Sequence, residues 1–79
     1  MVIDDGFLGK VSELAASLTP ITDMAVLLDV EEDDLRVEIK DRRSPVSKAY
    51  RAAKAETALA MRRRELELAR AGSPLAAQL

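Results

Sequence analysis

One stretch of the chain, residues 45–71, restricts the fold more than any other feature. It takes up about a third of the 79 residues and consists mainly of Ala, Arg, Glu, Leu and Met, the strongest helix formers. Ser44-Pro45 is a helix-start signal, because serine caps helices and proline fits the first helical position. Gly72 is a typical helix stop. The sequence therefore predicts one long helix over residues 45–71.

This long helix is apolar on two sides, because about 100° of rotation per residue distributes its apolar residues over two faces. One face carries Val46, Ala49, Tyr50, Ala53, Ala60, Met61 and Leu68. The roughly opposite face carries Ala52, Ala55, Ala58, Leu59, Leu66 and Ala69. The preceding helices can bury one of these faces, and a second copy of the chain is the simplest way to bury the other. We therefore expect a homo-oligomer. Its expected interface residues are Ala52, Ala55, Leu59 and Leu66.

A first short helix is predicted near the start of the chain. Its apolar residues recur at three- and four-residue steps, as one side of a helix requires. They are Phe7, Leu8, Val11, Leu14, Ala15 and Leu18. Asp4 or Asp5 can cap its start. Thr19-Pro20 should end it, because a residue before proline is pushed out of the helical region.

Two further short helices are predicted before the long one. Thr19 is expected to cap the first of them, with Pro20 at its first position. A break at Asp29-Val30 separates it from a helix over residues 31–40, whose first turn holds four acids that a helix dipole favours. The expected fold is all-α and a single domain over residues 1–79. It comprises a three-helix unit over 4–41, the long helix over 45–71, and a short terminal helix over 74–79.

Residues 20–41 fit a helix-turn-helix. This motif needs a small residue where its helices cross closely, and apolar residues that fix their angle. Ala25 is the small residue, and Asp29 stands where glycine is most common. Aspartate tolerates the left-handed conformation better than most residues. The apolar set is Met24, Leu28, Val30, Leu35 and Ile39.

The chain contains no cysteine and no histidine. Disulfides, ordinary structural zinc sites and catalytic arrangements built on histidine are therefore excluded. Neither a phosphate-binding loop nor a calcium loop has the spacing that it needs. We expect a protein that is not an enzyme, with no cofactor and no metal site.

The acidic start of the chain is unlike a targeting peptide, and no apolar run is long enough to span a bilayer. We therefore expect a cytoplasmic protein without a membrane partner.

Charge is divided unequally along the chain. Residues 1–41 carry eleven acids and three bases, a net charge of −8, whereas residues 42–79 carry nine bases and three acids, a net charge of +6. Such asymmetry favours a nucleic-acid surface or head-to-tail contact between copies. Solvated helix faces would also explain it.

We expect any contact with DNA to be made by cations that follow acidic residues 31–34 in the sequence. In a helix-turn-helix the early residues of the second helix meet the bases, and here residues 31–34 are all acids, which phosphates repel. The chain has no Asn and a single Gln, the residues that read adenine best. The cations expected to meet phosphates are Arg42, Arg43, Lys48 and Arg51. The cations that could face a groove are Arg36 and Lys40.

Three parts of the sequence carry a resemblance to a known family. They are residues 23–30 (DMAVLLDV), a middle part with Leu35, Asp41, Ser44-Pro45, Ala49-Tyr50 and Lys54-Ala55-Glu56, and residues 67–76 (ELARAGSPLA). Over roughly residues 19–79 the chain resembles phage terminase small subunits. The resemblance implies a non-enzymatic DNA-packaging protein with a homeodomain-like helix-turn-helix. It also implies self-assembly through long helices and a terminase large subunit as partner. If the four cations named above meet phosphates, we expect weak and non-specific binding of double-stranded DNA. The location implied is the cytoplasm of a bacterial or phage-infected cell.

Two other functions remain open at this stage. In the first, the protein is an interaction module that does not bind DNA, and acidic residues 29–34 of one copy meet the basic long helix of another. In the second, it is a small helix-turn-helix transcription regulator. The acidic second helix weakens this alternative, because that helix would have to contact the DNA bases.

Overall fold

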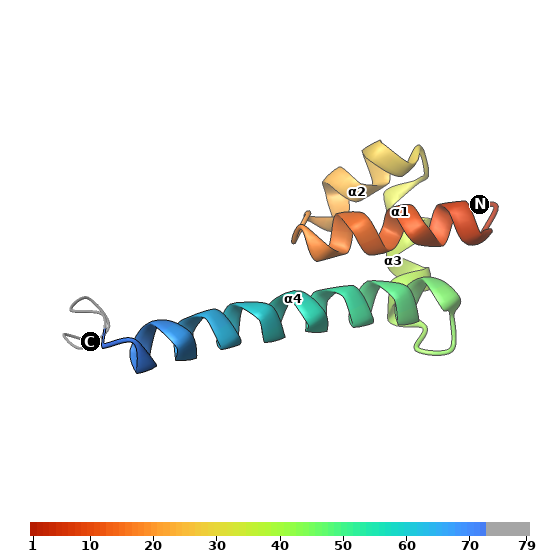
Figure 1. Cartoon of the computed structure of the whole chain (residues 1–79). Helices are drawn as coiled ribbons and strands as arrows, with labels where there is room; N and C mark the ends of the chain where they lie inside the picture. The colour runs from red at the N-terminus through yellow and green to blue at the C-terminus, as the bar shows by residue number, and fades with distance from the viewer. Residues whose placement is uncertain (73–79) are drawn as a thin grey trace.

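The protein is described by a computed structural model over residues 1–72, and this part of the chain is helical without strands (Figure 1). The four helices are α1 (Asp5–Ala16), α2 (Ile21–Leu28), α3 (Glu32–Lys40) and α4 (Pro45–Arg70). The predicted all-α fold is therefore confirmed, and so is the order of three short helices followed by a long one. The terminal helix predicted for residues 74–79 lies outside the described residues.

Helix α1 begins as predicted and ends earlier than predicted. The Asp4 side chain caps its start by accepting a hydrogen bond from the Phe7 N–H at 2.8 Å. At the other end Leu18 adopts the left-handed conformation, with φ 58°. The Leu18 N–H donates to the Ala15 carbonyl at 3.0 Å, and the next N–H donates to the Leu14 carbonyl at 3.1 Å. These two bonds form a Schellman motif. Leu18 therefore belongs to the turn, and its side chain is half-exposed.

The prediction that Thr19 caps α2 is wrong. The N-cap position belongs to Pro20, and no side chain makes a capping hydrogen bond there. Pro20 has φ −60° and ψ 147°, which is not helical, so it stands before the helix and not at its first position. The Thr19 N–H donates to the Leu14 carbonyl. Thr19 therefore completes the preceding turn, and α2 begins one residue after Pro20.

The turn between α2 and α3 has the conformation predicted for it. Asp29 is left-handed, with φ 55° and ψ 50°. Its N–H donates to the Val26 carbonyl at 3.2 Å, and the Val30 N–H donates to the Ala25 carbonyl at 3.0 Å. This is a second Schellman motif. Helix α3 then begins at Glu32, one residue later than predicted.

All four helices contribute to one small core. Its fully or nearly buried members are Val11, Met24, Ala25, Leu35, Ile39 and Val46. Four of these come from the apolar set and the small residue of the predicted helix-turn-helix, whose other members, Leu28 and Val30, pack against the core half-buried. These residues therefore pack the corner between α2 and α3.

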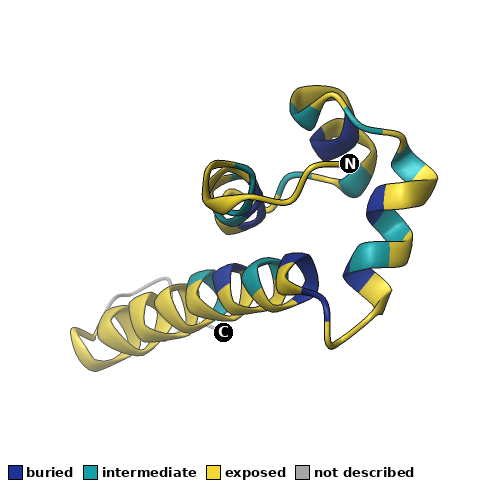
Figure 2. Cartoon of the chain, turned by 90° about the vertical axis from the view of Figure 1, so that its right-hand side faces the viewer, coloured by how far each residue is buried: buried dark blue, intermediate teal, exposed yellow. Residues whose placement is uncertain are grey.

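Helices α1 and α4 lie side by side and run in the same direction (Figure 1). Near the end of α1, the Thr57 hydroxyl donates to the Ala16 carbonyl at 2.7 Å. Helix α1 has 12 residues and spans about 18 Å, whereas α4 has 26 residues and spans about 39 Å. The second half of α4 therefore extends beyond the other helices, and every residue over 59–72 is exposed (Figure 2). The expectation that these helices cover one whole side of α4 holds only as far as Ala58.

Replacing Leu18 with glycine should stabilise the fold. Glycine adopts a positive φ without strain, whereas a residue with a Cβ loses about 1–2 kcal/mol there. After the entropic cost of glycine in the unfolded chain, we expect Leu18→Gly to gain about 1 kcal/mol, or about 4–8 °C in Tm. Thermal unfolding followed by circular dichroism measures this. Leu18→Ala is the matched control, because it keeps the Cβ, and an equal gain from both variants would contradict the explanation.

Candidate functional site

The connection between α3 and α4 is a tight turn that carries two exposed arginines. The Ser44 N–H donates to the Asp41 carbonyl at 2.9 Å and closes the turn. The Asp41 side chain also accepts a hydrogen bond from the Arg43 N–H at 3.1 Å. Arg42 and Arg43 therefore occupy the two central positions of the turn, and both are exposed. The Arg43 guanidinium lies 3.7 Å from the Asp41 carboxylate, with its side chain 95% exposed, so this pair is weak.

Ser44 holds this turn against both helices. Its hydroxyl accepts a hydrogen bond from the Val46 N–H at 3.2 Å, which caps α4 as predicted. The same hydroxyl donates to the Glu38 carboxylate at 2.6 Å, and Ser44 is buried. The end of α3 and the start of α4 are thus joined through one side chain. The sequence predicted the cap, but gave no sign of the Glu38 contact.

Two more cations lie on the first turns of α4. Lys48 and Arg51 are exposed. The Arg51 guanidinium donates to the Ser47 hydroxyl at 3.0 Å, and Ser47 is fully buried. We call Arg42, Arg43, Lys48 and Arg51 the cationic corner. The structure brings these four predicted phosphate contacts into the turn before α4 and its first two turns. Ser47 was missed from the sequence, where only its four-residue spacing from Arg51 could have indicated it.

Helix α3 exposes a mixed surface in which acids come first. Its exposed residues are Asp33, Asp34, Val37 and Lys40. Arg36 is half-buried, and its guanidinium donates to the Glu32 carboxylate at 3.0 Å. This guanidinium, followed by the Thr22 hydroxyl, holds the pKa of Glu32 below its usual value. Of the two cations predicted to face a groove, Lys40 is therefore exposed, and Arg36 is engaged with its own helix.

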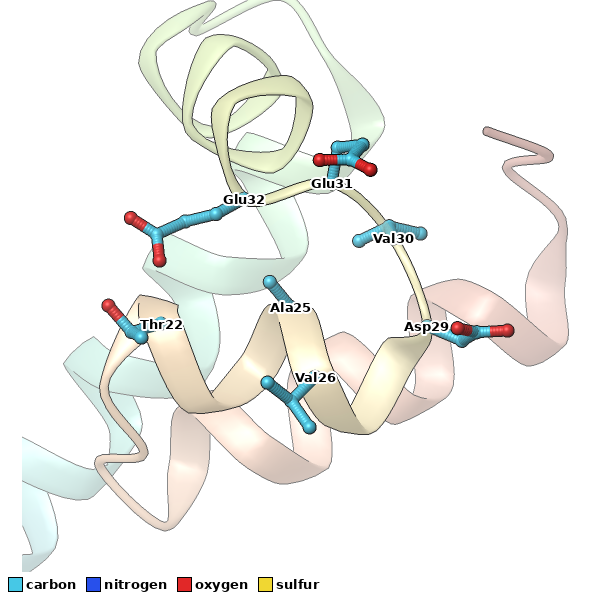
Figure 3. Close-up of a pocket in the computed structure, with 7 residues that line it drawn as sticks. All are labelled: Thr22, Ala25, Val26, Asp29, Val30, Glu31 and Glu32. Atoms are coloured by element: carbon cyan, nitrogen blue, oxygen red, sulfur yellow. The ribbon is translucent and has the colours of Figure 1, made fainter.

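A groove of about 460 Å³ lies between α2 and α3 (Figure 3). Apolar atoms of Ala25, Val26 and Val30 line it, and the Val26 side chain is 76% exposed. The polar residues that line it are Thr22, Asp29, Glu31 and Glu32. This groove was not predicted, because it depends on how the two helices cross.

The four residues predicted for an oligomer interface lie on α4, away from the core. Ala52 and Ala55 are exposed, and Leu59 and Leu66 are 43% and 53% exposed. The last two stand on the half of α4 that extends beyond the other helices.

In comparisons with known proteins, no family model, no curated protein and no solved structure matches the chain. Within residues 1–72, none of the helices combines the length and the apolar character needed to cross a membrane.

Ser44→Ala should destabilise the protein by about 1–2 kcal/mol, because it removes the cap of α4 and leaves the Glu38 carboxylate without its donor. Urea unfolding measures this loss. Ser17→Ala is the control, because Ser17 makes only an exposed hydrogen bond to the carbonyl of Glu13. We expect that variant to stay within about 0.5 kcal/mol of the unmodified chain. A similar loss in both variants would show that Ser44 has no special role.

Proposed function

We propose that the protein is a non-catalytic, self-associating protein that contacts the phosphates of double-stranded DNA, as phage DNA packaging requires. The observation that carries the proposal is the cationic corner. Its four exposed cations lie in the turn before α4 and in the first two turns of that helix. Cations gathered in this way attract phosphates without reading sequence. The resemblance to terminase small subunits adds a large subunit as protein partner and the cytoplasm as location.

The acids of α3 do not prevent this contact. Three of the four, Glu32, Asp33 and Asp34, occupy the first turn of α3, whereas the cationic corner follows its last turn. The fourth, Glu38, accepts a hydrogen bond from the Ser44 hydroxyl. The nine residues of α3 span about 13 Å, which exceeds the screening length of about 8 Å at physiological salt. Repulsion between the three acids of the first turn and a phosphate at the corner is therefore largely screened. The exposed acids also disfavour base reading by α3, so we propose binding with little sequence preference.

The second half of α4 supports self-association. Leu59 and Leu66 are seven residues apart and therefore lie on the same side of the helix. No other helix of residues 1–72 covers them, and both are close to half-exposed. Large apolar side chains that are exposed and lie away from the core in this way are typical of an interaction surface.

DNA binding should be weak, insensitive to sequence and strongly dependent on salt. Four phosphate contacts predict a slope of about −3.6 for the logarithm of the binding constant against the logarithm of salt concentration. Arg42→Glu/Arg43→Glu should reduce affinity for a labelled duplex at least tenfold, about 1.4 kcal/mol, because it replaces two attractive charges with repulsive ones. Fluorescence anisotropy measures both effects.

Lys54→Glu/Arg64→Glu is the matched control, because it changes net charge equally outside the cationic corner. We expect it to retain most of the affinity. Equal losses in both variants would show that only net charge matters. Binding that depends on one particular sequence would favour the transcription-regulator alternative, and absence of binding would favour the interaction module.

Self-association should depend on the exposed leucines of α4. Light scattering at micromolar concentration should show a dimer or a larger species. Leu59→Glu should shift it toward monomer, because a buried unpaired charge opposes contact. Val37→Glu is the control, since Val37 is 66% exposed but lies on α3. A monomeric unmodified protein, or an equal effect of the two variants, would contradict this assignment.

A further inference from the structure

The groove between α2 and α3 has the chemistry of a docking surface for a basic helix. Val26, an aliphatic residue that is three-quarters exposed, lines it, and covering apolar surface of this kind is favourable. Its rim is acidic. Of the rim acids, Glu32 pairs with Arg36, whereas Asp29 and Glu31 have no ion pair within residues 1–72. An occupant should therefore combine apolar side chains with cations (Figure 3).

The second half of α4 carries a surface of this kind. Leu59, Arg62, Arg63 and Leu66 stand at positions i, i+3, i+4 and i+7, the spacing by which a helix anchors in a groove. We call them the docking face. All four are exposed, and among the described residues neither arginine has an ion pair. The face spans about 10 Å, close to the 12 Å length of the eight-residue α2.

This face cannot reach the groove of its own chain. Helix α4 is continuous from Pro45 to Arg70, and its second half points away from α2 and α3 (Figure 1). The described part of the chain measures 49 Å along its longest axis and about 20 Å across. A contact between groove and docking face therefore requires two copies.

We infer that the docking face of one copy occupies the α2–α3 groove of the next. The leucines cover Val26 and its apolar neighbours, and the arginines pair with Asp29 and Glu31. Such a contact joins two different surfaces, so an open assembly keeps one free groove at one end and one free docking face at the other, and only a closed ring has neither. The inference rests on the proposed self-association, and it identifies the surface that receives α4. It does not depend on DNA binding.

Charge reversal on either side tests this contact. Thr22→Lys/Glu31→Lys places positive charge at exposed positions of the groove without changing the left-handed Asp29. Arg62→Glu/Arg63→Glu makes the docking face acidic. Each variant alone should associate at least tenfold more weakly than the unmodified protein in sedimentation velocity, because like charges then face each other. Lys54→Glu/Arg64→Glu has the same net charge as the second variant and lies off the docking face, so it should associate normally.

Mixing the two reversed variants should restore assembly. The unmodified docking face of the first fits the unmodified groove of the second, and the two reversed surfaces also fit each other. Recovery in the mixture also shows that both variants are folded. The inference is overturned if the groove variant associates as strongly as the unmodified protein, since α4 would then pair only with α4. It is also overturned if the mixture fails to assemble. A monomeric unmodified protein would overturn both this contact and the proposed self-association.

Discussion

The packing of α1 along the first half of α4 is the constraint on which the rest of the structure depends. It brings Val11 and Val46 into one core, and at the far end of the contact the Thr57 hydroxyl donates to the Ala16 carbonyl. Because α1 is less than half as long as α4, the contact stops near Ala58. The remaining residues of α4 have no cover within residues 1–72. An isolated helix of about 12–15 residues is marginal in water, so this half persists by continuity with the packed half.

The sequence predicted those features that short-range chemistry decides. Ser44-Pro45 set the start of α4, and Asp29 took the left-handed conformation expected of it. The error at Thr19 has a definite cause. Pro20 has an extended backbone, with ψ 147°, so it is not the first helical residue that a Thr19 cap requires. The sequence does not reveal this, because the preceding turn places Leu18 in a left-handed conformation that leucine seldom adopts.

The candidate sites differ in how far they could be predicted. The cationic corner is formed by residues close in sequence, so charge patterning was enough to find Arg42 to Arg51. Its supports were not predicted, since the contacts of Glu38 with Ser44 and of Ser47 with Arg51 depend on helix rotation and burial. The groove between α2 and α3 could not be predicted from the sequence. Its existence depends on the crossing of α2 and α3 and on the exposure of Val26, which the apolar pattern of α2 alone does not reveal.

The two proposed activities use different parts of the molecule and can therefore reinforce each other. In these proposals, the turn after α3 and the first two turns of α4 contact phosphates, whereas the α2–α3 groove and the second half of α4 mediate assembly. A single cationic corner with four charges would bind DNA only weakly at physiological salt. Copies joined head to tail would present several corners to one duplex, and each contact after the first becomes intramolecular, so avidity rises without any new residue. Assembly would thus convert a surface that reads no sequence into one that holds DNA firmly.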